Sequence, residues 1–180
     1  LGVFVAFGIF VFISQYLQLV VGLSPLEAGL WMLPWALAFV VGSTITPRLA
    51  HRVRPSLIIA IGLVISGIGI GLLFEIDAET SFWWILVSLV ISSLGLAPVF
   101  TLAMDLVVGS APPARAGAAS AISETTAELG GALGIAVMGS IGTALYRKEL
   151  SGLIPDGIPQ EVRLVALDTL GGAVQVSKSL

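Results

Sequence analysis

The stretch AASAISETTAELGGALGIAVMGSIGTALY, residues 118–146, decides the fold, because it is apolar enough to cross a bilayer yet contains two carboxylates. In an α-helix, Glu124 and Glu128 are separated by about 40° of rotation and about 6 Å of rise, so both acids point the same way. A hydrocarbon core about 30 Å thick over roughly residues 118–137 places Glu128 near its middle. A carboxylate that meets lipid there costs about 3 kcal/mol or more, so we expect both acids to face a water-filled cavity or a partner.

The remainder of this helix has two unlike faces. The residues expected near the acids are Gly117, Gly131, Ile135 and Gly142, and those expected opposite are Ile122, Thr126, Leu129, Leu133 and Val137. One side is therefore acidic and mostly small, and the other is apolar.

The composition indicates an all-α integral membrane protein. Of the 180 residues, 57% are hydrophobic and 11% are charged, whereas a soluble domain has about 25% charged residues. The net charge of −3 does not indicate nucleic acid as a partner. The chain has no cysteine, which excludes disulfides and thiolate metal sites. We expect no metal and no other cofactor.

Long apolar runs predict five transmembrane helices. Their expected ranges are about 1–23, 26–46, 56–74, 81–104 and 117–146. Ser24 and Pro25 suit the N-cap and first turn of the second helix, and Glu27 at its head suits the helix dipole. Pro47 is expected to end that helix, and Glu75–Glu79 forms an acidic turn before the fourth.

The distribution of basic residues predicts the orientation, because cytoplasmic loops carry the excess of lysine and arginine. Two loops hold four basic residues, whereas the other two hairpin loops hold none. These cytoplasmic residues are Arg48, Arg52, Arg54 and Arg115. Residues 147–180 are then an extracytoplasmic loop that leads to a missing final helix, although Arg147 and Lys148 argue against this side.

Polar and aromatic residues elsewhere are further candidates, each with two interpretations. Gln15, Tyr16 and Gln18, at the outer end of the first span, either line a cavity or anchor the helix at the interface. Trp31 and Trp35, one turn apart, either offer aromatic faces to a cation or pack against lipid or core, which is the more usual role.

The cytoplasmic side has its own candidates. Asp105 is expected to end the fourth span, and it either meets Arg115 or the Arg48–Arg54 cluster in a latch or is a solvated helix end. His51, beside three arginines, is expected to be a solvated loop residue. Glycines 67, 69 and 71, and glycines 130, 131 and 134, include small-xxx-small spacings that indicate helix packing rather than a substrate path.

Three stretches resemble the major facilitator superfamily, specifically the fourteen-helix drug:proton antiporters that include the quaternary-ammonium resistance pumps. They are Gln15–Pro34 (QYLQLVVGLSPLEAGLWMLP), Thr46–Pro55 (TPRLAHRVRP) and Ala116–Tyr146, of which the last is the most specific. The resemblance implies that the chain is five transmembrane helices from the C-terminal half of such a transporter. It also places recognition of cationic drugs, or proton coupling, on Glu124 and Glu128.

Two departures from the family pattern stand out. His51 occupies a position where an aspartate is typical of the first-half copy of this loop. The glycine-and-proline antiporter motif belongs to the first half, so this chain does not contain it.

The expected function is that of a proton-coupled secondary transporter in the plasma membrane, which exports lipophilic, often cationic drugs by alternating access. The proton gradient supplies the energy, and the expected partners are the small substrates, membrane lipid and the N-terminal half of the same transporter. A facilitator for another solute, such as a siderophore, lipid or peptide, and a non-transporting membrane scaffold stay open as alternatives. Enzyme function is not expected, because HExxH, GxSxG and Walker motifs are all missing from the sequence.

Overall fold

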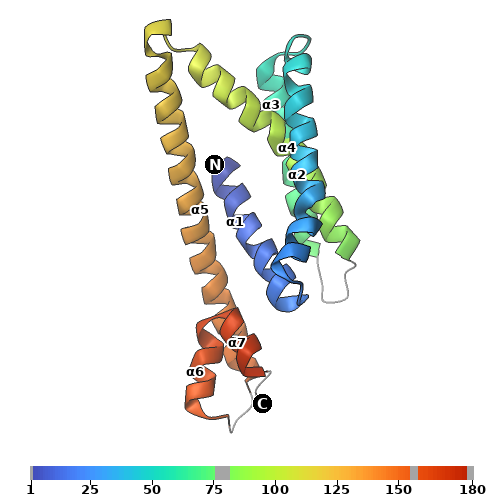
Figure 1. Ribbon diagram of the computed structural model, residues 1–180, viewed down its shortest axis with the longest axis vertical. Helices are drawn as coiled ribbons and strands as arrows, with labels where there is room; N and C mark the ends of the chain where they lie inside the picture. Colours follow the sequence, from blue (N-terminus) through green and yellow to red (C-terminus); the bar gives the residue numbers. More distant parts are fainter. Residues whose placement is uncertain (1, 76–81, 155–157, 178–180) are drawn as a thin grey trace. The chain divides into compact units, whose positions relative to one another are not determined.

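The computed structural model describes residues 2–75, 82–154 and 158–177, and this part of the chain contains helices and no strand (Figure 1). Within it, five helical segments are long and apolar enough to cross a membrane. They are Gly2–Val20, Pro25–Ala50, Pro55–Leu72, Phe82–Gly109 and Pro113–Leu153. The predicted all-α fold with five spans is confirmed, and the chain is a multi-pass membrane protein.

The first span changes its helical pitch near its end. Helix α1 (Gly2–Gln15) continues into a π-helical turn, η1 (Tyr16–Val20). There the Val21 amide donates to the Tyr16 carbonyl at 3.0 Å, five residues back instead of four. The apolar pattern of the sequence did not predict this turn, because a π-turn inserts one residue without changing the composition.

Helix α2 (Pro25–Ala50) begins as predicted and ends later. The Ser24 amide and hydroxyl donate to the Glu27 carboxylate at 2.9 and 2.7 Å, and the Glu27 amide donates to Ser24 Oγ at 3.3 Å. This is a reciprocal capping box. The predicted end at Pro47 is wrong, because the helix continues through the proline. Thr46 Oγ1 donates to the Gly42 carbonyl at 2.7 Å in the turn before this proline.

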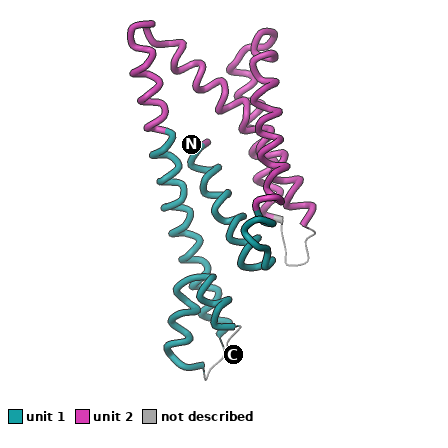
Figure 2. Tube along the Cα trace, viewed as in Figure 1, with its two compact units in different colours: residues 1, 3–28, 127–180 teal, residues 2, 29–126 magenta. Residues whose placement is uncertain are grey.

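The chain divides into two compact units, with boundaries within α2, between residues 28 and 29, and within α5, between residues 126 and 127 (Figure 2). Unit 1 comprises residues 1, 3–28 and 127–180, and unit 2 comprises residues 2 and 29–126. The long helix α5 (Ala116–Leu153) thus contributes to both units.

In unit 2, α3 (Pro55–Leu72) and α4 (Phe82–Gly109) cross with their backbones in contact. A Cβ atom added at Gly62 would lie 2.6 Å from the carbonyl oxygen of Gly95, and one at Gly69 would lie 2.5 Å from the Ser92 amide nitrogen. Small residues permit this approach between membrane helices. The predicted packing role is confirmed for Gly69.

Helix α2 packs on the same central helix, α4. Ser93 is fully buried and donates its hydroxyl to the Trp35 carbonyl at 2.8 Å. Farther along, a Cβ atom at Gly42 would lie 2.7 Å from the Cβ of Ala97. Helix α4 is therefore the core of unit 2. Its buried residues are Ile85, Ser88, Leu89, Ser92, Ser93, Gly95, Leu96, Ala97 and Leu102.

In unit 1, the glycines of α5 face the phenylalanines of α1. A Cβ atom at Gly134 would collide with the Phe4 carbonyl, and one at Gly142 would lie 2.5 Å from the Phe12 ring. Gly131 is buried against the Phe7 ring. The predicted packing role is therefore confirmed for Gly131 and Gly134, and Gly142, which was expected on the face of the acids, also contacts α1.

Helix ends account for the remaining differences between prediction and structure. Helix α4 runs to Gly109, so Asp105 lies within it rather than at its end. Helix α5 continues about two turns beyond Tyr146, because residues such as Arg147 and Lys148 are good helix formers whose charges do not stop a helix at a membrane surface. The tail contains two short helices, α6 (Gln160–Asp168) and α7 (Leu170–Ser177). Most of the predicted acidic turn lies outside the described residues.

Candidate functional site: the acidic face of helix α5

The two predicted acids lie on one uninterrupted helix. Helix α5 is helical throughout Ala116–Leu153, so Glu124 and Glu128 are one turn apart, as the sequence indicates. Both side chains are exposed. Neither carboxylate forms a hydrogen bond or salt bridge with another residue in the described part of the chain. Two adjacent carboxylates on a membrane-spanning helix are thus open to groups from outside this chain.

The two faces of α5 beside the acids differ in whether another helix covers them. Its glycine face is occupied by α1, as at Gly131 and Gly134. Its apolar face is exposed, and Ile122 and Leu129 there are 67% and 59% exposed. At helical pitch, Glu128 lies between these two faces, so a partner can reach it without displacing α1.

A surface hollow of about 510 Å³ follows the same helix beyond the acids. It is lined by Ile135, Ala136, Gly139, Ser140, Thr143, Ala144 and Arg147. All of these residues belong to α5, so the hollow has a wall of small side chains from one helix alone. Within the described residues, no cluster of histidine, cysteine, aspartate and glutamate could hold a metal ion.

The tryptophans of α2 are packed by other aromatic rings or by backbone. The Trp31 ring meets Phe82 edge-on with centroids 4.6 Å apart, and Trp83 at 5.9 Å. Trp35 is half-buried, and its carbonyl accepts the Ser93 hydroxyl. These contacts agree with the interpretation that Trp31 and Trp35 pack against neighbouring groups. A role in cation binding stays a prediction.

The polar residues near the end of the first span are placed by the π-turn. Gln15 is exposed at the last position of α1, and Tyr16 is half-buried at the first position of η1. Gln18 is also half-buried, and its amide donates to Ser14 Oγ at 3.0 Å. A cavity-lining role for these residues stays a prediction.

The predicted cytoplasmic groups form no salt bridge with one another within the described residues. Arg48 lies in the last turn of α2, where its guanidinium makes a long 3.5 Å contact to the Thr44 carbonyl. His51, Arg52, Arg54, Asp105 and Arg115 are exposed. Asp105 forms no salt bridge with an arginine in the described part of the chain. The interpretation as solvated residues therefore fits this structure better than a latch.

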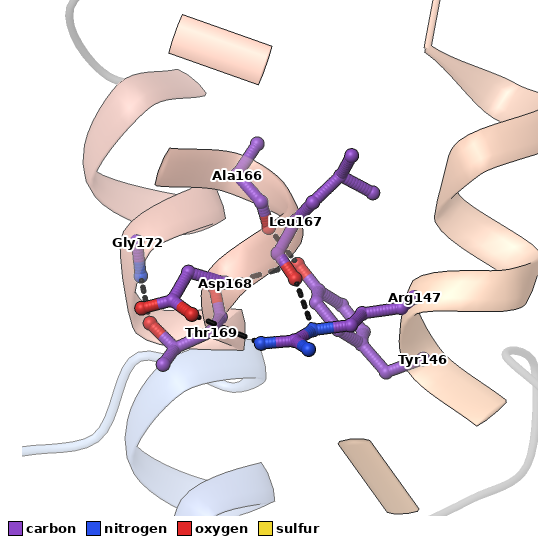
Figure 3. Close-up of polar contacts among 7 residues, drawn as sticks. All are labelled: Tyr146, Arg147, Ala166, Leu167, Asp168, Thr169 and Gly172. Atoms are coloured by element: carbon purple, nitrogen blue, oxygen red, sulfur yellow. Dashed lines mark hydrogen bonds and ion pairs between the residues drawn. The ribbon is translucent and has the colours of Figure 1, made fainter. Parts of the chain in front are cut away.

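Sequence reasoning missed one polar cluster. Tyr146 and Arg147, near the end of α5, bind the joint between α6 and α7 (Figure 3). Their partners are mainly backbone carbonyls. Every residue has a backbone carbonyl, so no side-chain motif in the sequence indicates this contact.

Comparisons with known proteins agree with this architecture. Residues 1–146 match the Major Facilitator Superfamily. The chain is 38% identical over 173 residues to the multidrug efflux pump LfrA of Mycolicibacterium smegmatis, which covers 96% of this chain and 34% of the relative. It is 31% identical over 169 residues to the methyl viologen resistance protein SmvA of Salmonella typhimurium, which covers 93% of this chain and 33% of the relative.

A third relative is the tetracenomycin C resistance and export protein of Streptomyces glaucescens, with 30% identity over 150 residues, 81% of this chain and 26% of the relative. The chain thus spans about a third of the length of the curated relatives that it matches. No solved structure shows significant similarity to it. The family match covers all five membrane-spanning helices apart from the end of α5, and the chain belongs to the Major Facilitator Superfamily.

Proposed function

We propose that the protein containing this chain is a proton-coupled secondary transporter that exports lipophilic, often cationic drugs from the cell by alternating access. The observation that carries the proposal is the pair Glu124 and Glu128, which are exposed on an apolar membrane-spanning helix and have no hydrogen-bond or ion-pair partner among the described residues. Acids at such depth are costly unless they face water or a partner, and they are usually functional. The similar proteins named above are efflux and resistance proteins, which favours drugs as the substrate class.

The proposed mechanism is competition for the acid pair. In this mechanism the acid pair carries either a proton or the cationic substrate, and not both at once. When a lipophilic cation binds beside the carboxylates, its positive charge takes the place of that of the proton. Release of the cation on the outer side of the membrane then allows a proton to bind the acids again. The proton thus moves inward as the cation moves outward.

The remaining wall of the binding site is assigned to the N-terminal half of the same transporter. In transporters built from two halves, substrate sites form near the bilayer midplane and the halves rock about them. The exposed side of α5 is suited to this arrangement because α1 leaves Glu128 uncovered. The proposed location is the plasma membrane, and the proposed energy source is the proton gradient.

The test uses the full-length protein in proteoliposomes with an imposed proton gradient and tetraphenylphosphonium as the lipophilic cation. Glu128→Gln should abolish proton-driven transport, because glutamine keeps the size of the side chain but cannot exchange a proton. Glu149→Gln, an exposed site at the end of the same helix, is the matched control and should retain wild-type transport. Both variants should express equally.

Undiminished proton-driven transport in the Glu124→Gln, Glu128→Gln double variant would reject the role of the acids. Wild-type transport that runs down the substrate gradient, without any response to the proton gradient, would instead indicate a facilitator. No binding or transport of any solute would indicate a scaffold.

A further inference from the structure

The C-terminal end of α6 is bound by two consecutive side chains of α5 (Figure 3). The Tyr146 hydroxyl donates to the Ala166 carbonyl at 2.9 Å. The Arg147 Nε donates to the Leu167 carbonyl at 3.0 Å, and another guanidinium nitrogen pairs with the Asp168 carboxylate at 3.0 Å. Carbonyls in the last turn of a helix have no partner within that helix. Helix α5 therefore caps α6 from outside.

The capped end of α6 is also the start of α7. Thr169 separates the two helices in an extended conformation, with φ −145° and ψ 153°. Its Oγ1 accepts the Gly172 amide at 3.0 Å, which is an N-cap bond for α7. A Cβ atom at Gly172 would lie 2.5 Å from the Val165 carbonyl, so the two helices are closely apposed at this joint. Contacts that fix this joint therefore also fix the positions of α6 and α7.

Helix α7 also lies against the end of the first span, close to this joint. It contacts the π-turn η1, and a Cβ atom at Gly171, in its first turn, would lie 4.0 Å from Leu19 Cδ1. All of these elements belong to unit 1. The joint between α6 and α7 thus contacts α5 through residues 166–168 and the terminal turn of the first span through the start of α7.

Neither tail helix is long enough to persist by itself. Helix α6 has nine residues and α7 has eight, whereas isolated helices shorter than about 12 residues are marginal in water. The side chains of Arg147 and Asp168 are 53% and 72% exposed, so their ion pair contributes little. The hydrogen bonds of Tyr146 and Arg147 to the carbonyls of α6 are therefore the main polar anchor of the tail.

We propose that α6 and α7 form a strap that fastens the π-turn at the end of the first span to the end of α5, with Tyr146 and Arg147 as its anchor. The inference does not depend on the transported substrate. Because its described polar bonds to α5 are the hydrogen bonds of Tyr146 and Arg147 and one exposed ion pair, we expect it to open by local unfolding while the membrane-spanning helices remain folded. In this view α6 and α7, which lie in the predicted loop 147–180, connect the two membrane-spanning helices.

The test is site-specific cross-linking in the full-length protein. This chain has no cysteine, so Leu19→Cys and Gly171→Cys are introduced in a background whose remaining cysteines, if any, are replaced. A short bifunctional methanethiosulfonate reagent bridges the two thiols. The cross-link should form readily, and Tyr146→Phe combined with Arg147→Ala should slow its formation about tenfold. Lys148→Ala, an exposed neighbour that makes none of these bonds, is the control and should not change the rate.

Hydrogen exchange provides the second measurement. In the anchor variant, the amides of Gly172 and Ala173 should exchange at least tenfold faster, while those in the middle of α5 should be unchanged. Failure of the cysteine pair to cross-link in correctly folded protein would reject the strap. An unchanged cross-linking rate and unchanged exchange in the anchor variant would reject Tyr146 and Arg147 as its anchor. Neither result would alter the proposed role of Glu124 and Glu128.

Discussion

Helices α4 and α5 are both long, apolar and rich in small residues, but the described structure uses them differently. Half of the most apolar segment of α4 is buried, whereas for α5 the share is 11%. Small residues of α4 bring α3 and α2 against its backbone, as at Gly95 and Ser93. Helix α5 uses its glycines for α1 alone and leaves its acidic side open.

The polar groups of the two helices differ in the same way. The buried hydroxyls of Ser88 and Ser92 donate to carbonyls of their own helix, both at 2.8 Å. A hydroxyl can be satisfied locally in this manner, but an ionised carboxylate only accepts hydrogen bonds and the helix backbone has no free donor in its interior. Glu124 and Glu128 therefore require water or groups from elsewhere. Helix α4 is therefore a scaffold, and α5 presents a surface.

The largest expected effect comes from filling the backbone contact on α4. Gly95→Leu forces a side chain into the Ser66 amide and the Gly62 carbonyl, which are backbone atoms that cannot move aside. Overpacking typically costs about 1–3 kcal/mol, and a backbone collision costs more. We expect loss of monodisperse full-length protein in size-exclusion chromatography. Gly67→Leu on α3, where nothing lies within 4 Å, is the control and should be recovered at wild-type yield.

A smaller effect is expected from the hydrogen bond between α2 and α4. Ser93→Ala removes the bond to the Trp35 carbonyl and should lower the unfolding free energy of the full-length protein in mixed micelles by about 1 kcal/mol, since such interhelical bonds contribute about 0.6–2 kcal/mol. Ser88→Ala is the matched control, because Ser88 is equally buried and its bond of the same length stays within α4. Equal losses for both variants would mean that the bond between helices adds nothing.

The smallest effect on stability is expected on α5. Replacing both Glu124 and Glu128 by glutamine removes no hydrogen bond or salt bridge within the described residues, so the unfolding free energy should change by less than about 0.5 kcal/mol, as for other exposed substitutions. The same unfolding titration measures it. A marked gain or loss would show that the carboxylates are structural, and it would weaken the division between scaffold and presenting surface.

Several features were predictable because they depend on local chemistry. The start of α2 follows from Ser24 and Glu27, whose side chains are close enough along the chain to cap each other. The adjacency of Glu124 and Glu128 follows from helical pitch. Helix ends were less predictable, since neither Pro47 nor Arg147 stops a helix that other groups support. The sequence pattern also could not show which small residues pack against another helix. Gly69 does so, whereas nothing lies within 4 Å of a Cβ atom at Gly67.

By itself, the sequence determined that this chain is a helical membrane protein with five spans and two acids on one side of the last, because hydropathy and helical pitch are properties of the chain alone. Only the tertiary structure decided which glycines are covered, where α1 lies along α5, and that Tyr146 and Arg147 hold the tail. Those outcomes depend on backbone groups approaching from distant segments, and backbone groups are the same at nearly every position of a sequence.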